Sequence, residues 1–546
     1  MDWNGQKMRR NERYSFLRPQ FLVLFLLLSG AVFAFAEQNI ALRIQGNAAI
    51  PVGNKNYTTG FGLGLAADWT FLPWLGLSLN GAYSGIGAQG TENFSLFEGG
   101  IGPLFQWRLN DRFTLQAEGT IGLYQVRWKD EGETHLKAGG TLSAYFHATP
   151  YISILAYAGM NGYRTAPFGG LSAGAGISLN LPEIISRKTR VQGEKIEQRP
   201  VFPVSYAWYE DNPVAVVRIT NNEPNTVTSL SLSFFLEQYM KTPTVFAVLP
   251  SLAPGEQADF PVTALFNEAM LDLTENINAN ALISIDYRSL GSRKRGTFAV
   301  TMPVYHRNAL SWDDDRRAAS FVSSRDPAAR LFAKYAGSVM DDMLREDIPR
   351  NVQYALALFE ALNLYGVSYI IDPASSYIKM SQDASSLDNL NYPYETLFYR
   401  GGDCDDLSIL FCSLLEVLGI DTAFITTPGH IFMAFEIEAS RNLTAEGAEG
   451  RWRMLNDDKL ISFEGSVWMP VEITIPGEGF LRAVQVGTQE WKRAGDKAKL
   501  YPMRDSWEVY PAASVPNAAG RMPVLPEEDA LTRAIDNSLA RYLRGR

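Results

Sequence analysis

The sequence predicts a multidomain protein with an N-terminal eight-stranded antiparallel β-barrel, a middle β-sandwich and a C-terminal α+β domain. Three observations predict this order. Apolar and polar residues alternate from about residue 39 to residue 181, shorter strand-like segments fill the next ~110 residues, and helical spacing takes over near Ala309. The 546 residues exceed the usual size of one domain several times, and the 46% apolar content is enough for separate cores.

The first residues have the pattern of an export signal. Basic residues, among them Arg9, Arg10 and Arg18, precede an apolar run, and this run ends in the small-x-small pattern Ala34-Phe35-Ala36. We therefore expect residues 1–36 to be a signal peptide and Glu37 to begin the mature chain. A membrane anchor is the alternative, although the run is short for a span of about 20 residues.

Residues 37–182 predict the barrel. Within Phe113–Leu123 the apolar residues occupy one face, and polar residues such as Gln116 and Glu118 occupy the other. The same alternation with a period of two occurs in eight segments in all. Short turns alternate with longer polar loops, which we expect near Asn54, Gly90, Glu131 and Thr165. This wiring is typical of outer-membrane barrels. An even number of strands puts both ends of the barrel on the short-turn side, which is the periplasmic side.

Aromatic residues gather beside the short turns, as in an interfacial girdle. They are Trp69, Phe71, Trp74, Trp107, Phe113, Tyr145, Phe146 and Tyr151. The alternative is a soluble lipocalin-like barrel or sandwich, which alternates in the same way but turns its apolar face inward.

Residues 183–307 begin with a charged linker and continue as about seven short strands broken by Asn-Asn-Glu-Pro and Pro-Gly-Glu turns. This pattern predicts an immunoglobulin-like β-sandwich. The region carries no constellation of catalytic residues, so we interpret it as a spacer or docking module.

Residues 308–500 predict the α+β domain. One helix is expected to begin at Asp326-Pro327 and another to run from Pro349 to Gly366, before a series of strands. Residues 501–546 form a C-terminal extension with an amphipathic helix that we expect to pack on a neighbouring element. Its apolar residues are Leu531, Ala534, Ile535, Leu539 and Tyr542.

The segment Gly401–Leu407 carries the most informative motif, with Cys404 between acidic residues and an apolar helical stripe directly after it. Asp403 is a natural N-cap, so Cys404 is predicted to lie in the first helical turn. The helix dipole there favours an anion and can lower the pKa of a thiol, whereas Asp405 and Asp406 oppose this effect. The other cysteine, Cys412, is expected about 12 Å away along the helix, beyond disulfide reach, as an apolar filler.

A base and an orienting acid follow Cys404 along the chain. His430 is the one histidine after the sandwich, at the start of a predicted strand. A cysteine at a helix start packed on a strand histidine is a nucleophile and base pair, and Glu472 in the next convincing strand can fix the imidazole. We therefore predict Cys404, His430 and Glu472 as the catalytic residues.

These motifs resemble the transglutaminase-like superfamily: Gly-Asp-Cys-x-Asp-Leu at a helix start, Leu-Gly-Ile about 15 residues later, a strand histidine and Trp-x-Pro-Val-acid-x-Thr. The resemblance covers about 308–487 and implies a papain-like fold with Cys404, His430 and Glu472 as triad. The family's acid is usually Asp, so Glu472 is a departure that its extra methylene must accommodate.

Composition restricts the partners and cofactors. The net charge of −10, without a long basic run, argues against a nucleic-acid partner. No cofactor is expected, and no metal, because the catalytic region lacks the paired His and Cys ligands of zinc. The acidic run 313–315 is interpreted as a helix start or a surface cluster.

The predicted function is an exported thiol-dependent acyl-transfer enzyme: a peptidase, amidase or transglutaminase-type enzyme acting on peptide or glutamine amides. The expected partners are a peptide or protein substrate, including cell-wall peptides, and the outer membrane through the barrel, with the C-terminal domains in the periplasm. Two alternatives remain at this point. One is a non-catalytic envelope binding protein with a degenerate module, and the other is a transport or adhesion protein in which the barrel is primary.

Overall fold

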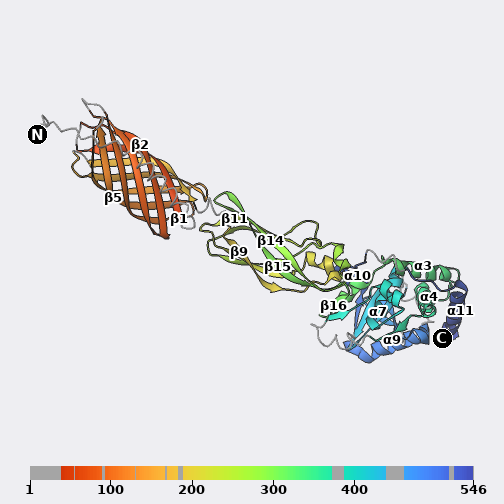
Figure 1. Cartoon of the computed structure of the whole chain (residues 1–546). Coiled ribbons are helices and arrows are strands. Elements are labelled where there is room, and N and C mark those ends of the chain that lie inside the picture. Colours follow the sequence, from red (N-terminus) through yellow and green to blue (C-terminus); the bar gives the residue numbers. More distant parts are fainter. Residues whose placement is uncertain are drawn as a thin grey trace, which may run out of the picture.

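The computed structural model describes residues 39–53, 56–88, 93–128, 131–166, 169–181, 189–371, 387–437, 460–515 and 522–544. Three folded parts follow one another along an elongated molecule: the barrel, a two-sheet β region and an α/β region (Figure 1). The predicted signal peptide, residues 1–36, lies outside the described residues. Among the helices in the described ranges, none has the length and apolarity to cross a membrane.

The first part is a closed antiparallel barrel of eight strands, in which β8 pairs with β1, as the alternation predicted. The strands are β1 (Asn39–Val52), β2 (Gly60–Leu72), β3 (Leu75–Ile86), β4 (Phe94–Arg108), β5 (Phe113–Trp128), β6 (Glu131–His147), β7 (Ile152–Tyr163) and β8 (Gly169–Asn180). Both ends of the barrel chain lie on the side of the short turns, as an even strand number requires.

The apolar face of the barrel points outward. Ile121 and Leu142 are 68% and 66% exposed, whereas Gln116 and Glu118 are buried in the interior. A soluble barrel needs the opposite arrangement, because water would face the apolar side chains. The alternative of a lipocalin-like barrel is therefore wrong.

Two details of the barrel differ from the sequence prediction. Tyr145 is buried inside the barrel, because outward positions on β6 have even numbers, and it does not belong to the exposed girdle. The other strand aromatics predicted for the girdle are 37–54% exposed on the outer wall. The region near Glu131 is no long loop, since β5 and β6 remain paired out to Trp128 and Glu131.

Paired charges cross the barrel interior. Arg43, which is 2% exposed, donates hydrogen bonds to Asp68 at 2.9 Å and to Glu118 at 2.6 Å. Further along the interior, Lys137 forms an ion pair with Glu98 at 3.2 Å. Buried charges are stable only when they are paired, and these contacts pair the charged side chains that they join in the interior.

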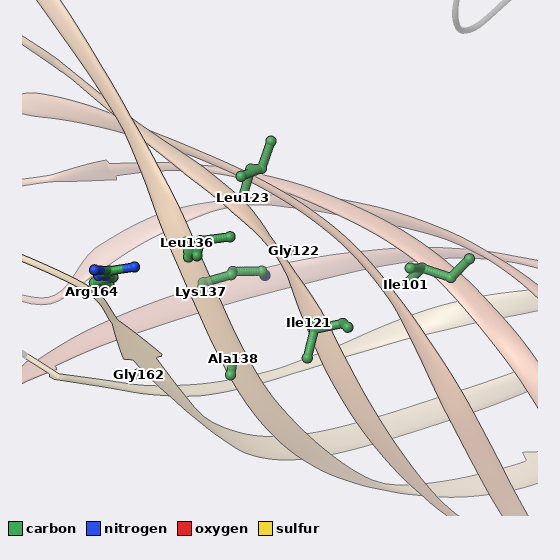
Figure 2. Close-up of a pocket in the computed structure, with 9 residues that line it drawn as sticks. All are labelled: Ile101, Ile121, Gly122, Leu123, Leu136, Lys137, Ala138, Gly162 and Arg164. Atoms are coloured by element: carbon green, nitrogen blue, oxygen red, sulfur yellow. The ribbon is translucent and has the colours of Figure 1, made fainter.

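A shallow hollow on the outer wall of the barrel is lined by apolar side chains, including Ile121, Leu123 and Leu136 (Figure 2). It forms where the small residues Ala138 and Gly162 lie between the large ones. A second hollow, around Trp107 and leucines and alanines of the neighbouring strands, also lies on this wall. Both belong to the apolar face and lie far from the residues predicted to be catalytic (Figure 1).

The middle part has two antiparallel sheets, with orders β13-β10-β9 and β12-β11-β14-β15, around a shared apolar core. Its strands are β9 (Val191–Gln198), β10 (Ala215–Asn221), β11 (Val227–Phe235), β12 (Thr244–Leu252), β13 (Gln257–Val262), β14 (Ile277–Ser289) and β15 (Ser292–Val304), with the 3-10 helices η1 (Pro203–Glu210) and η2 (Glu268–Asp272). The immunoglobulin-like assignment of this part stays a prediction.

The short-turn end of the barrel contacts the middle part. The turn between β4 and β5 places Arg108 against Asn225, and the Asp111 carboxylate accepts a hydrogen bond of 2.9 Å from the Thr226 backbone N–H. The bond to Thr226 and the nearby Arg108 outweigh partial burial and lower the pKa of Asp111. The barrel is therefore connected to the rest of the molecule at its short-turn end (Figure 1).

The third part has a five-stranded sheet of order β22-β23-β21-β20-β24, with helices packed against it. Its elements are β16 (Ala309–Ser311), η3 (Asp315–Phe321), α3 (Pro327–Asp341), α4 (Arg350–Tyr365), β17 (Ser368–Tyr369), β18 (Leu387–Asn389), α6 (Pro393–Tyr399), β19 (Gly401–Gly402), α7 (Cys404–Val417), β20 (Thr422–Thr427), β21 (His430–Glu436), β22 (Ile461–Phe463), β23 (Ser466–Val471), η6 (Pro476–Glu478), α9 (Phe480–Ala494), η7 (Gly495–Lys497), β24 (Lys499–Pro502), α10 (Met503–Val509) and α11 (Glu528–Arg544).

Local sequence signals explain where these helices begin and end. Asp326 caps α3 by accepting a hydrogen bond from the Ala329 N–H, with Pro327 as the first helical residue. Gly366 ends α4 with a φ of 89°, a left-handed conformation that glycine adopts without strain. Asp314 caps η3, so the acidic run 313–315 is a helix start, as we interpreted it.

The C-terminal segment packs into the same unit. β24 crosses residue 500, the predicted domain boundary, and forms the edge of the five-stranded sheet beside β20. The amphipathic helix α11 packs on α4 as expected, and Ser538 donates a hydrogen bond of 2.7 Å to the buried Glu360. Within this segment, residues 501–515 and 522–544 are the described ones, and β24 and α11 in them pack onto the α/β core.

One arginine links the middle and third parts. The guanidinium of Arg317, on η3, lies 5.4–5.6 Å from the rings of Phe202, Trp208 and Tyr510. Asp313 accepts a hydrogen bond of 2.9 Å from it. A desolvated cation over aromatic faces contributes about 2 kcal/mol or more, so this cluster stabilises the joint.

Candidate functional site

The site is built around the first turn of α7. The backbone reaches it through β19, which pairs in parallel with β17. A Cβ atom on Gly402 would lie 2.4 Å from the Cβ of Asp406, so only glycine allows the helix to begin so close to the strand. Asp403 occupies the N-cap position, as predicted, but its side chain makes no capping hydrogen bond.

Cys404 is the first residue of α7, and its side chain packs against β21. Pro428 and Gly429 form a two-residue turn, so Thr427 and His430 are the pair that closes the hairpin. In an antiparallel pair, hydrogen-bonded and non-hydrogen-bonded positions alternate. The backbone N–H of the next residue, Ile431, therefore points away from β20. Strand β23 pairs with β21 only from Met433 onward. The N–H of Ile431 is therefore left for the Cys404 thiol, which accepts hydrogen bonds from Ile431 and Asp405.

Burial dominates the electrostatic setting of Cys404. The residue is only 5% exposed. Burial, with the carboxylates of Asp403 and Glu472, raises the pKa of the thiol to about 12, and the two backbone N–H groups offset this only in part. The net pKa is raised because desolvation and neighbouring negative charge exceed the favourable effect of the helix start. At neutral pH the group is a thiol that requires a base.

His430 and Glu472 are in direct contact. Met433 pairs with Val471, so the next residue after Val471, Glu472, lies across from Phe432. Phe432 and His430 are on the same face of β21, and the Glu472 carboxylate reaches His430 diagonally across the two strands. The distance from His430 Nε2 to Glu472 Oε2 is 2.5 Å. The glutamate is 3% exposed, and the histidine side chain is 28% exposed. A buried acid therefore orients a histidine that opens toward solvent.

Thr474 holds the second oxygen of this carboxylate. Its backbone N–H and its hydroxyl donate to Glu472 Oε1 at 3.1 Å and 2.5 Å. Burial raises the pKa of Glu472, but the bonds from His430 and Thr474 outweigh it, and the resulting pKa is lower than usual. The acid is thus ionised at neutral pH. Thr474 was not predicted, although its position two residues after the acid was the available signal.

The contact with Glu472 determines what His430 can do. A neutral imidazole has one N–H donor and one acceptor nitrogen. With Nε2 donating to the carboxylate, Nδ1 is the nitrogen that can accept a proton. His430 adjoins Ile431, whose N–H contacts the Cys404 thiol. Nδ1 is therefore the acceptor nitrogen on the residue next to the N–H that contacts the thiol.

Asp403, Asp405 and Asp406 form a buried acidic group beside Cys404. Each offers a carboxylate oxygen within 4.8 Å of the others, the one such group of three that the described residues contain. Burial and Asp403 raise the pKa of Asp406 to about 7, against hydrogen bonds from Asn391, and burial also raises that of Asp405. Oxygen ligands suit a hard cation such as Ca²⁺ and lack the His or Cys that zinc prefers. The prediction that this protein needs no metal stays a prediction.

Tyr369 is a further site residue, which the sequence did not single out. Its pairing partner is Gly402, two residues before Cys404. The side chain is 40% exposed, and its phenol interacts electrostatically with Cys404 and Glu472. No local pattern could reveal this neighbour, because the pairing joins segments more than 30 residues apart.

Comparisons with known proteins concern the barrel. Neisserial surface protein A is 13% identical and matches 26% of this chain and 96% of its own, with a TM-score of 0.24. Ail of Yersinia pestis is 16% identical over 26% of this chain and 98% of its own, with a TM-score of 0.21. The N-terminal β-barrel domain of OprF from Pseudomonas aeruginosa is 11% identical over 26% and 98%, with a TM-score of 0.20. No family model and no curated protein matches the chain.

The geometry of the N-terminal part indicates its structural class. It is a closed eight-stranded antiparallel barrel with an apolar outer wall and a polar interior, which are features of outer-membrane barrels.

Replacing Glu472 with glutamine is expected to reduce thiol acylation by on the order of 10²-fold or more. The amide can present an N–H to Nε2, which favours the tautomer that leaves Nδ1 unable to accept a proton. Glu472→Asp retains the charge but shortens the reach of the carboxylate, so we expect a smaller loss. The rates of acylation by p-nitrophenyl acetate provide the measurement. If the glutamine variant reacts as fast as the unaltered protein, Glu472 has no role in orienting the base.

Proposed function

We propose that this protein is an exported, barrel-anchored, thiol-dependent acyl-transfer enzyme of the transglutaminase-like type. The observation that carries the proposal is the hydrogen bond of 2.5 Å between His430 and Glu472, next to a cysteine at a helix start. His430 contacts Glu472, and the N–H of the next residue, Ile431, lies against the Cys404 thiol. A nucleophile, a base and an orienting acid in this neighbourhood support cysteine-dependent acyl transfer.

In the proposed reaction, His430 takes the proton of Cys404 as sulfur attacks the carbonyl carbon of an amide. The amine or ammonia leaves with a proton from the imidazolium, and a thioester remains on Cys404. Water or another amine then takes the acyl group. Peptide or glutamine amides are the substrate class that fits this chemistry.

The location of the site supports substrates of the cell envelope. We propose that the barrel lies in the outer membrane, because its apolar wall is a face that lipid can cover. Its short-turn end contacts the middle part, so the other parts extend into the periplasm. There the site meets envelope proteins and cell-wall peptides. The middle part serves as an immunoglobulin-like spacer.

The interior of the barrel argues against transport as the main function. The ion pairs from Arg43 to Asp68 and Glu118 cross the lumen with short contacts. A solute would have to break these buried pairs in order to pass. The barrel is therefore better suited as an anchor than as a channel.

The full chain in detergent micelles, incubated with p-nitrophenyl acetate, tests the enzymatic proposal. This small ester needs no specific recognition and releases a coloured phenolate when it acylates a thiol. We expect rapid release and an acetyl group on Cys404, located by mass mapping of peptides. Adding an amine such as glycine amide separates hydrolysis from transfer. If Cys404 stays unmodified while release is slow, the protein is a binding module rather than an enzyme.

Replacing Leu142 with arginine tests the membrane location. Leu142 lies on the outer wall and is 66% exposed, and arginine on a lipid-facing wall costs about 2–4 kcal/mol near the middle of a bilayer. We expect a lower urea midpoint for the loss of protease resistance of the barrel in lipid vesicles. Val248→Arg is the matched control, because Val248 is 70% exposed on the middle part and would face water in both states. Equal midpoints for the two variants would contradict a membrane-embedded wall.

A further inference from the structure

The hollow on the outer wall of the barrel has a floor of small residues and a rim of large apolar side chains (Figure 2). Ala138 on β6 pairs directly with Gly162 on β7, so a single methyl group covers the backbone of both strands at this level. On the other side Ala138 pairs with Ile121, whose side chain is 68% exposed. Leu136 and Leu123 form the next outward pair along the same strands. The hollow is therefore an apolar depression that opens away from the barrel.

Arg164 lies at the end of the hollow that is farther from the middle part. β7 ends at Tyr163, but its ladder continues for one more residue, because the Arg164 N–H donates to the Leu136 carbonyl at 3.0 Å. Arg164 is two residues beyond Gly162, so its side chain lies on the same outward face, where it is exposed. Figure 2 shows it beside Leu136 among the residues that line the hollow.

The carboxylates on the neighbouring parts of β4 and β6 are engaged by other groups. Glu98 accepts a hydrogen bond of 3.2 Å from Lys137 in the interior of the barrel. Glu133 lies 3.2 Å from the ring of His135. Within the described ranges, no carboxylate forms an ion pair with Arg164. Its guanidinium is therefore a cation beside an apolar depression, available to an anionic group from outside the chain.

We propose that the hollow binds an acyl chain of an anionic lipid whose phosphate head group contacts Arg164. An acyl chain matches the apolar lining, and a phosphate matches the guanidinium, which can donate two parallel hydrogen bonds to it. The inference goes beyond the proposed enzymatic function, but it rests on the proposed membrane location of the barrel. Because Arg164 is at the end opposite the middle part, the lipid belongs to the outer leaflet.

Native mass spectrometry of the full chain in detergent micelles tests the head-group contact. Phosphatidylglycerol and phosphatidylcholine with the same oleoyl chains are added at equal concentrations, so that they differ in the net charge of the head group. We expect about fivefold more phosphatidylglycerol to remain bound, the usual effect of one basic residue beside an anionic lipid. Arg164→Gln removes this preference and Arg164→Lys keeps it. Arg127→Gln is the matched control and keeps it too, because Arg127 is exposed near the same end of β5 but does not line the hollow.

A second pair of variants tests the place of the acyl chain. Ala138→Leu fills the floor of the hollow without a change of charge. We expect it to lower the retention of phosphatidylglycerol by roughly fourfold or more, the effect of losing about one buried CH₂ group. Ala175→Leu is the matched control, because Ala175 is an exposed alanine on β8 that does not line the hollow, and it leaves retention unchanged.

Three results overturn the inference: equal retention of the two lipids by the unaltered protein, an equal loss of preference in Arg164→Gln and Arg127→Gln, or unchanged retention in Ala138→Leu. Protease resistance of the barrel reports folding, and Ala138→Leu decides the question if Arg164→Gln does not fold. Retention of neither lipid also overturns the inference. The membrane location fails as well only if Leu142→Arg and Val248→Arg give equal urea midpoints, so the two failures are distinguishable.

Discussion

Replacing Cys404 with alanine is expected to abolish acyl transfer, with a loss on the order of 10⁴- to 10⁶-fold relative to the unaltered protein, because the variant has no atom that can form the thioester. Alanine fits the space of Cys404, which packs against the Ile431 N–H in the buried first turn of α7. The loss is measured as p-nitrophenolate release and as the absence of an acetylated peptide that contains residue 404.

Cys412→Ala is the matched control for this variant. Cys412 lies in the same helix and is fully buried, and burial raises the pKa of its thiol well above the usual value. We expect it to remain unmodified and its substitution to leave acylation unchanged. If acylation persists in Cys404→Ala and disappears in Cys412→Ala, the assignment of the nucleophile is wrong.

Replacing His430 with alanine is expected to slow acylation at pH 7 by about 10²- to 10⁴-fold, the usual contribution of a general base. The pKa of Cys404 is raised to about 12, so the thiol is protonated at neutral pH and a base must remove its proton during attack. Without His430, the remaining rate depends on the small thiolate fraction. As the pH rises toward 12, the thiolate fraction increases about tenfold with each pH unit.

The pH profile distinguishes this role from misfolding. The rate of His430→Ala should rise steeply from pH 7 to pH 10 and approach that of the unaltered protein, whose rate is already high near neutrality. His306→Ala is the control, because His306 lies at the end of the middle part, where partial burial lowers its pKa. A flat pH profile for His430→Ala, at the unaltered rate, would contradict a role as base.

The barrel shows which features of a fold a periodic sequence pattern can predict. Alternation with a period of two predicted eight strands and an apolar face, because side chains of a strand must alternate between two faces. It could not decide whether that face pointed inward or outward. Closure of β8 on β1 decided this, since it placed Gln116 and Glu118 inside and Leu142 outside. Tyr145 followed the same rule and turned inward, although its sequence neighbours suggested the girdle.

For the candidate site, too, the sequence predicted some features and the tertiary structure decided others. Local signals placed Cys404 at a helix start, His430 at a strand start and Glu472 two residues from Thr474, because caps, turns and strand alternation are properties of short segments. The catalytic role of these residues stays a prediction. Their contacts depend on the pairing of β21 with β23, which the sequence indicated only through the resemblance of its motifs.

By itself the sequence determined the order of the three parts, the period of each strand and the positions of the helix starts around Cys404. Only the tertiary structure decided which barrel face meets the outside, how deeply the thiol is buried and that Tyr369 pairs with Gly402, two residues before Cys404. The physical reason is that periodicity and capping act over a few residues. Burial, electrostatic environment and the β17–β19 pairing instead depend on segments that meet only after the chain has folded.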